Sequence, residues 1–173
     1  GAGLPALAIA IAFADWHVTS VEGTGKKATF QRRAAEHLGL ANLTVRNVRA
    51  EALARDEDVR ESFDVAGARA LAALPIVLEL TAGLVKLGGM ILAWKGPDVE
   101  GELAAAGRAA KLLRVEHERT VSYRLSELAA AVGLPCPDAE DPRFHLLVFR
   151  KTSLCPDRYP RDYSQIRRSP LGS

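Results

Sequence analysis

Two glycines and a glutamate near the start of the chain have the spacing of a nucleotide-type binding site. Gly1 and Gly3 lack a Cβ, so the backbone can turn tightly there and a ligand can approach it closely. Glu22 follows Gly3 by nineteen residues, at the end of an alternating run that predicts a strand over 16–22. A glycine loop at a helix start, with an acid at the next strand end, can hold ribose hydroxyls. On the glycines alone, an ordinary strand-to-helix turn stays open as the alternative.

The other chemistry-bearing side chains form no recognisable catalytic or metal-binding group. The four histidines are scattered, and Cys136 and Cys155 lie far apart without metal-ligand spacing. We therefore expect no metal site, no nucleophilic triad and no acid/base pair. The two cysteines are expected to be reduced thiols.

Composition and charge indicate a soluble globular protein with a polyanionic partner. A length of 173 residues predicts one domain. The content of 48% hydrophobic and 25% charged residues is that of a soluble globular protein. The sequence contains no run of eighteen apolar residues, so no membrane span is predicted. Residues 143–173 carry seven Lys/Arg against two Asp, a net +5, which leaves −3 for the rest of a chain whose total is +2. A basic end on a near-neutral body favours nucleic acid as the partner. A merely solvated terminus is the alternative.

Strand patterns alternate with helix patterns along the chain, which predicts an α/β fold with a parallel sheet and helices on both faces. The predicted helices are 4–13, 26–38, 51–61, 74–85, 99–113 and 125–132, and the predicted strands are 16–22, 43–48, 63–68, 90–94, 114–122 and 145–149. The helix over 26–38 should bury Phe30, Ala34 and Leu38. Little regular structure is expected from Thr152 onward.

Polar side chains follow four of the predicted strands. They are Glu22, Glu51, Arg69 and Lys95. Because the carboxyl ends of parallel strands share one edge of a sheet, we expect these four residues along a single ligand-binding edge.

The motifs taken together resemble the glucose-inhibited-division-B family of methyltransferases. The resemblance rests on Gly-Ala-Gly-Leu-Pro (1–5), Gly-Lys-Lys (25–27), Arg-Ala-Glu (49–51), Phe-Asp-Val (63–65), Ala-Arg-Ala (68–70), Gly-Gly (88–89), Lys-Gly (95–96), Arg-Lys (150–151), Tyr-Pro-Arg (159–161) and Arg-x-Ser-Pro-Leu-Gly (167–172). Each motif is short, but the ordered set covers nearly the whole chain. The resemblance implies a Rossmann-like class I fold that transfers a methyl group from S-adenosylmethionine to N7 of a guanine in 16S ribosomal RNA.

The resemblance also implies roles for individual residues. The implied cofactor contacts are the glycine loop, an acid that binds the ribose, a pair of residues beside the adenine, and an arginine that reaches the polar end of the cofactor or the RNA. These residues are Gly1, Gly3, Leu4, Glu22, Ala50, Glu51 and Arg69. RNA phosphates are assigned to Lys95, Arg150, Lys151 and Arg161. Guanine N7 carries a free lone pair, so no general base is required and none is expected.

The family normally begins with helices and a strand before the glycine loop, and we expect these to be missing here. The expected organisation is therefore a methyltransferase domain over 1–151, truncated at its N-terminus, and a basic tail over 152–173. We expect a monomer without membrane association, in a bacterial cytoplasm or in a chloroplast or other organelle with bacterial-type ribosomes. A methyltransferase with another substrate, a nicotinamide dehydrogenase and a truncated RNA-binding relic without catalysis stay open as alternatives.

Overall fold

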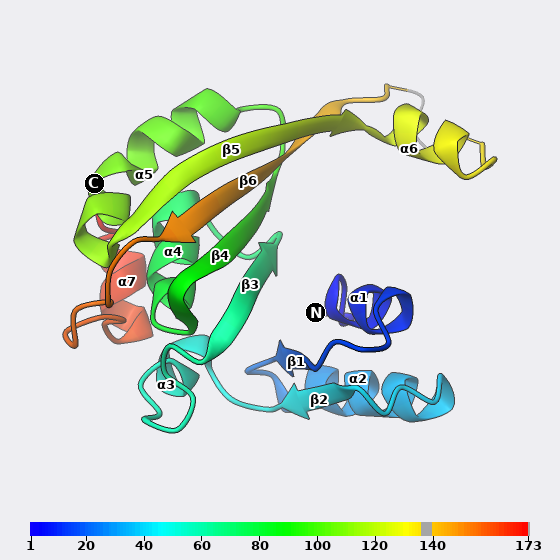
Figure 1. The fold of residues 1–173 in the computed structure, drawn as a ribbon, viewed down its shortest axis with the longest axis horizontal. Coiled ribbons are helices and arrows are strands. Elements are labelled where there is room, and N and C mark those ends of the chain that lie inside the picture. The colour runs from blue at the N-terminus through cyan, green and yellow to red at the C-terminus, as the bar shows by residue number, and fades with distance from the viewer. Residues whose placement is uncertain (136–139, 173) are drawn as a thin grey trace.

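The computed structural model describes residues 1–135 and 140–172, so Cys136 lies outside the described residues. Helices and strands alternate through most of the chain, as the sequence pattern predicts (Figure 1). The elements are α1 (Ala6–Ala12), β1 (Val18–Val21), α2 (Gly25–His37), β2 (Leu43–Arg46), α3 (Ala50–Leu53), β3 (Phe63–Arg69), α4 (Leu74–Ala82), β4 (Val85–Lys95), α5 (Val99–Leu113), β5 (Val115–Arg124), α6 (Leu125–Ala131), β6 (Arg143–Lys151) and α7 (Tyr163–Arg168). No helix among these residues has the length and apolar character needed to cross a membrane.

The strands form two separate sheets. β1 pairs with β2 in parallel, and the second sheet has the order β3-β4-β6-β5. In that sheet β3 and β4 are parallel, whereas β6 runs antiparallel to both β4 and β5. The predicted α/β class is confirmed, but a single continuous sheet is wrong, because no strand of the described residues joins the free edges of β1 and β3. Figure 1 also shows β1 and β2 running in a different direction from β3 and β4.

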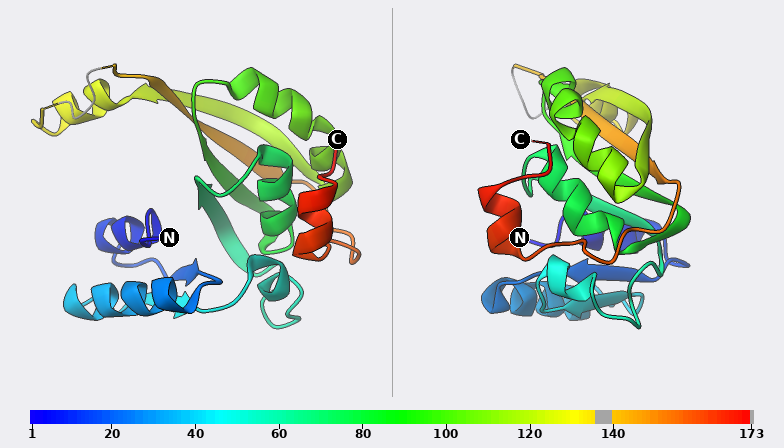
Figure 2. Two further views of the ribbon diagram at one scale, coloured as in Figure 1. Left: turned by 180° about the vertical axis from the view of Figure 1, so that it is seen from behind. Right: turned by 90° about the vertical axis from the view of Figure 1, so that its left-hand side faces the viewer.

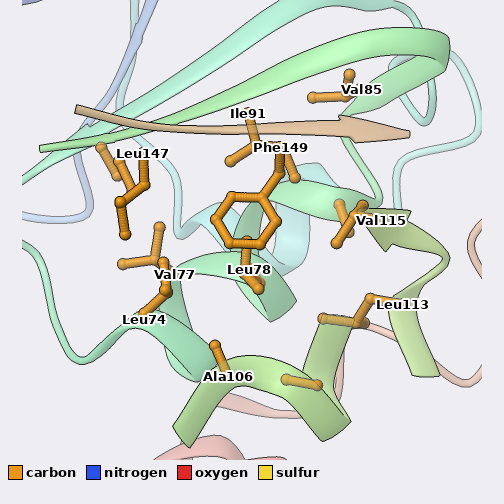
Figure 3. Close-up of a cluster of buried hydrophobic side chains, with 14 of the residues drawn as sticks. Leu74, Val77, Leu78, Val85, Ile91, Ala106, Leu113, Val115, Leu147 and Phe149 are labelled. Carbon is orange, nitrogen blue, oxygen red and sulfur yellow. The ribbon is translucent and has the colours of Figure 1, made fainter. Parts of the chain in front are cut away.

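The main core lies between the four-stranded sheet and helices α4 and α5. Leucine, valine and phenylalanine side chains from both layers meet there (Figure 3). Ile91, Leu147 and Phe149 from the central strands are at most 2% exposed, and they pack against Leu78 and Leu113 of the helices. α4 is buried along almost its whole length because it packs on the sheet and is flanked by α5 and α7. This core fixes the positions of β3 and β4, whose carboxyl ends face solvent.

The chain after Thr152 is not a free tail. Cys155, Tyr159 and Leu171 pack against the main core, and Ile166 of α7 is fully buried. Burial raises the pKa of the Cys155 thiol, which therefore stays protonated at neutral pH. Arg60 donates hydrogen bonds to the carbonyls of Tyr159 and Cys155 at 3.0 and 2.8 Å. Apart from the six-residue helix α7, the segment has little regular structure, as expected, but it packs against the body of the protein.

Helix α2 uses a different face from the one predicted. Ala28, Gln31 and Ala35 are buried, whereas Phe30 is 55% and Leu38 50% exposed. Small side chains let the helix lie close to the two-stranded sheet, and the larger apolar residues turn outward. The error has a physical cause. Periodicity identifies the helix face with the most apolar side chains, but the close contact made here requires the face with the smallest side chains.

Gly89 gives a direct test of how β3 and β4 fit together. Between the pairs Phe63–Val85 and Val65–Met90, β4 contains three more residues than β3. A Cβ at Gly89 would lie 2.5 Å from Val85 Cγ1 and 2.7 Å from the Asp64 carbonyl oxygen. Gly89→Ala should therefore lower the free energy of unfolding by about 1–3 kcal/mol. Urea denaturation followed by circular dichroism measures this.

Gly107→Ala is the matched control, because the same added methyl group meets open space on α5. It should raise stability by about 0.5–1 kcal/mol through helix propensity. Equal effects of the two substitutions would contradict the tight contact at Gly89.

Candidate functional site

The glycine loop and Glu22 meet at the carboxyl end of β1. The α-amino group of Gly1 contacts the Glu22 carboxylate, and Gln31 Nε2 donates to the Gly1 carbonyl at 2.9 Å. Gln31 is itself held by the Ser20 hydroxyl at 2.6 Å, inside the interface of α2 with β1. Gly3 has φ of +84°, and a Cβ there would lie 2.7 Å from Leu7. Any other residue would be strained at this positive φ and would have to displace the Leu7 side chain.

Glu22 has the electrostatics of an anchored carboxylate. Desolvation by burial acts to raise its pKa, but the hydrogen bonds from the N-terminal ammonium and the Thr24 amide outweigh it and lower the pKa. The Thr24 N–H donates to Glu22 Oε1 at 2.8 Å. At neutral pH the group is therefore an ionised hydrogen-bond acceptor, as an acid that holds hydroxyl donors must be.

Residues that follow β2 lie next to Glu22. Asn47 Nδ2 donates to the Glu22 carbonyl at 2.7 Å. Arg49 lies against Gly23, where a Cβ would come within 2.9 Å of its Cδ, and its Nε donates to Glu51 Oε1 at 3.0 Å. This hydrogen bond and the adjacent carboxylate charge of Glu51 help to raise the pKa of the Arg49 guanidinium.

We refer to Gly1, Glu22, Asn47, Arg49 and Glu51 as the Glu22 cluster. It brings together the glycine loop, the predicted ribose acid and the predicted adenine pair, since Ala50 and Glu51 open α3. Leu4, the remaining predicted contact of the loop, is 57% exposed beside it.

Arg69 lies away from this cluster. Val21, at the end of β1, packs near Phe63, the first residue of β3, whereas Arg69 is the last residue of that seven-residue strand. The two ends of such a strand are roughly 20 Å apart. The prediction that Glu22, Glu51, Arg69 and Lys95 share one sheet edge is therefore wrong. The cause is the separate direction of the β1–β2 sheet (Figure 1).

A hollow of about 360 Å³ opens at the carboxyl ends of β3 and β4. It is lined by Ala68, Ala70, Leu71, Ala72, Val77, Trp94, Lys95 and Gly96. Successive side chains of a strand point to opposite faces. Ala68 and Ala70 line the hollow, so the side chain of Arg69, between them, points away from it. Arg69 is exposed there, and the described residues give it no ion pair.

Lys95 is a structural residue in this arrangement. Its Nζ donates to the Ala72 carbonyl at 2.7 Å and to Glu102 Oε1 at 2.9 Å, and its side chain is only 9% exposed. Glu102 also accepts from the Leu74 amide at 2.7 Å. Lys95 and Glu102 therefore close the loop that begins α4, which leaves little of the charge for a phosphate.

The predicted phosphate contacts of the C-terminal part are also engaged internally. The Lys151 side chain is completely buried, and its ammonium contacts Glu61 and the carbonyls of Ala82 and Val85. Lys151 as an RNA contact is therefore wrong, because RNA cannot reach it in this fold. Arg161 binds the fully buried Glu79 through Nε and Nη2 at 2.8 and 2.7 Å.

Arg150 is the most accessible of the four predicted RNA contacts. Its side chain is 40% exposed, although it donates to Glu118 at 2.5 Å and to the Gly88 carbonyl at 2.8 Å. Its partner Glu118 also forms an ion pair with Arg119.

Sequence reasoning missed three polar residues that position the Glu22 cluster: Gln31, Asn47 and Arg49. Gln31 lies within an amphipathic helix pattern whose buried face was misassigned, so its role was hidden. Asn47 and Arg49 directly follow the strand 43–46, and polar residues at a strand end could have signalled them. Arg49 also stacks on Tyr163 of α7 at 4.0 Å, a contact between distant segments that no local pattern indicates.

Comparisons with known proteins agree on one family. The family model described as rRNA small subunit methyltransferase G matches residues 1–129. The ribosomal RNA small subunit methyltransferase G of Bacillus subtilis is 37% identical over 171 residues, covering 99% of this chain and 66% of its own length. That of Rubrobacter xylanophilus is 38% identical and is covered over 62% of its length. The chain thus spans slightly less than two thirds of these relatives.

Solved structures of low sequence identity have the same fold, and two of them are named as methyltransferases. A 16S rRNA (adenine(1408)-N(1))-methyltransferase from Catenulisporales acidiphilia, solved with its cosubstrate, has a TM-score of 0.65 at 15% identity, covering 94% of this chain and 84% of that one. A putative methyltransferase from Thermoplasma acidophilum has a TM-score of 0.64 at 15% identity, covering 88% and 65%. At such identities the likeness establishes the fold alone.

Proposed function

This chain belongs to the rRNA small subunit methyltransferase G family, and from that premise we propose that it is part of an enzyme that methylates N7 of a guanine in 16S ribosomal RNA. The proposed cofactor is S-adenosyl-L-methionine. The observation that carries the proposal is the Glu22 cluster, which places the glycine loop, held by Gln31, beside Glu22 and the start of α3. A substrate of this kind belongs to a compartment with bacterial-type ribosomes, either a bacterial cytoplasm or an organelle.

The residues of the Glu22 cluster fit an adenosine group. Glu22 supplies an anionic acceptor for the two ribose hydroxyls. Ala50 and Glu51 offer backbone and carboxylate groups beside the adenine. Leu4 and Gly3 would border the methionine part of the cofactor. Because Arg69 lies at the far end of β3, we place it on the RNA side of the proposed site.

Catalysis in this proposal depends on position and not on proton transfer. When bound, the cofactor supplies a sulfonium methyl group that is open to attack by a lone pair. Guanine N7 presents such a lone pair without losing a proton, so the chain needs no general base. The task of Glu22 and the glycine loop is to hold the cofactor still. Holding both partners in line supplies several kcal/mol of the barrier reduction through proximity and orientation.

Arg69 is the residue through which the proposal can be tested on the RNA side. Arg69→Ala should reduce methyl transfer to small-subunit particles by roughly 10- to 100-fold at saturating cofactor, because a charge-assisted hydrogen bond to a phosphate contributes about 1.5–3 kcal/mol. The assay follows transfer of a radiolabelled methyl group.

Arg33→Ala removes an equal charge from the exposed face of α2 and should leave the rate within a factor of two. An unchanged rate in Arg69→Ala would remove Arg69 from the site. No transfer by the wild-type chain, together with binding of NAD and not S-adenosylhomocysteine in calorimetry, would favour a dehydrogenase instead.

A further inference from the structure

A second hollow lies far along the chain from the Glu22 cluster, between α5 and the C-terminal segment. It has a volume of about 440 Å³ and is lined by Arg108, Leu112, Arg158, Tyr159, Arg161, Ser169, Pro170, Leu171 and Gly172. We call it the basic pocket. Figure 2 shows α7 and the C-terminal end lying beside α5, with the N-terminus on the opposite side of the molecule. The motifs 159–161 and 167–172, which have no place in the Glu22 cluster, form most of its wall.

The charge of the basic pocket is strongly one-sided. Of the residues that the structure describes, three arginines and no acidic side chain line it. Arg161 is neutralised by the buried Glu79 behind it. Within the described residues, Arg108 has no ion pair, and Arg158 has only the ring of Tyr159, 5.1 Å from its guanidinium. Asp157 lies next in sequence, but its carboxylate is directed to Arg60 at 3.9 Å. Among residues 1–135 and 140–172, these two guanidinium groups therefore have no carboxylate partner.

The pocket is also anchored firmly enough to be preformed. Arg161 donates to the Ser169 carbonyl at 3.0 Å, which fixes one wall against the other. Gly172 lies against α5, where a Cβ would come within 2.7 Å of the Ala105 carbonyl oxygen. Leu171 and Tyr159 pack against the main core. A rigid apolar wall with two unpaired guanidinium groups suits a phosphate, which each guanidinium can bind through two parallel hydrogen bonds.

We propose that the basic pocket binds a phosphate group carried by a nucleotide, with Arg108 and Arg158 as its ligands and the walls of Leu112 and Leu171 beside the sugar. A pocket of this volume matches a ligand of one nucleotide, within the usual range of small-molecule sites.

RNA is the source that the surroundings favour. Arg167 and Arg168 lie exposed on α7, and the same helix begins at Tyr163, which stacks on Arg49 of the Glu22 cluster. A six-residue helix is about 9 Å long, so the exposed arginines of α7 extend the positive surface beyond the basic pocket. The choice of RNA as the ligand rests on the proposed function, whereas the phosphate site itself does not.

The test is the salt dependence of RNA binding in the absence of cofactor. A fluorescein-labelled single-stranded 16-mer RNA is titrated with the wild-type chain and with the double variant Arg108→Gln/Arg158→Gln at several salt concentrations. Affinity at low salt should fall by roughly tenfold, and the slope of log K against log salt should fall by about 0.7, since the variant loses one phosphate contact to a single strand. Both arginines are exposed, so circular dichroism should show an unchanged fold.

The control variant Arg33→Gln/Lys111→Gln removes two positive charges outside the pocket, one of them on α5 itself. It should change the affinity by less than a factor of two. Equal losses in the two double variants would overturn the proposal, because they would show only a general effect of net charge.

Competition by guanosine monophosphate that depends on Arg108 and Arg158 would support the phosphate site and assign it to a free nucleotide. RNA binding that depends on the two arginines, without any methyl transfer, would support the phosphate site and count against the proposed function alone.

Discussion

Lys151→Met should lower the free energy of unfolding by about 3–5 kcal/mol, a large part of the total stability of an ordinary domain. The Lys151 ammonium is fully buried, and its three donors are used by Glu61, the Ala82 carbonyl at 2.7 Å and the Val85 carbonyl at 2.9 Å. Methionine keeps the length of the side chain but leaves a carboxylate and two carbonyls without their partner. Urea denaturation followed by circular dichroism at pH 7 measures the loss.

The same contact joins four parts of the fold, which explains the size of the expected effect. Lys151 belongs to β6, Ala82 to the end of α4 and Val85 to the start of β4. Glu61 in turn accepts from the Cys155 amide at 2.7 Å and so ties the C-terminal segment to the same point.

Arg150→Met is the control, because Arg150 is the neighbouring cation on the same strand and forms an exposed pair with Glu118. It should lose much less stability. If Lys151→Met does not fold, the double variant Lys151→Met/Glu61→Gln, which lacks the stranded carboxylate, should recover part of the loss. Similar stabilities for Lys151→Met and Arg150→Met would show that the buried contact does not stabilise the fold.

Glu22→Ala should weaken the binding of S-adenosylhomocysteine by roughly 10- to 100-fold, if the Glu22 cluster is the cofactor site. A carboxylate that accepts two hydroxyl hydrogen bonds contributes about 1.5–3 kcal/mol, and tenfold in affinity corresponds to about 1.4 kcal/mol. Titration calorimetry at neutral pH measures the change, where the lowered pKa of Glu22 keeps the wild-type group ionised.

Glu36→Ala is the matched control, since Glu36 is exposed on α2 and the described residues give it no ion pair. Its affinity should equal that of the wild type. Glu22→Gln, which keeps an acceptor but loses the charge, should fall between the two. If Glu22→Ala binds S-adenosylhomocysteine as tightly as Glu36→Ala does, the adenosine group lies elsewhere.

The predicted α/β class, most element positions and the glycine–acid pairing of the Glu22 cluster could be read from the sequence. These features depend on local spacing: alternation between strand and helix patterns, and an acid nineteen residues after a glycine loop. Such features depend on residues close together in the chain, so a single sequence is enough to predict them. The ordered set of motifs likewise indicated the family that the comparisons then established.

Only the tertiary structure decided which acidic side chain forms an ion pair with each basic residue. Lys95, Lys151 and Arg161 are basic residues in suitable sequence positions for phosphates, yet Glu102, Glu61 and Glu79 bind them inside the fold. These partners are 7, 90 and 82 residues away, and two of the three separations exceed any local pattern. The sequence therefore determined how many positive charges the chain carries, and long-range packing decided which of them stay free for a ligand.

The same reason explains the separation of Arg69 from Glu22. The carboxyl ends of the strands were predicted to within two residues, but their placement on one edge assumed that every strand joins one sheet. Hydrogen bonding between strands is a long-range property, and here it pairs β1 only with β2 and β3 only with β4. Local sequence thus determined where each strand ends, whereas pairing across the fold decided which strand ends lie together.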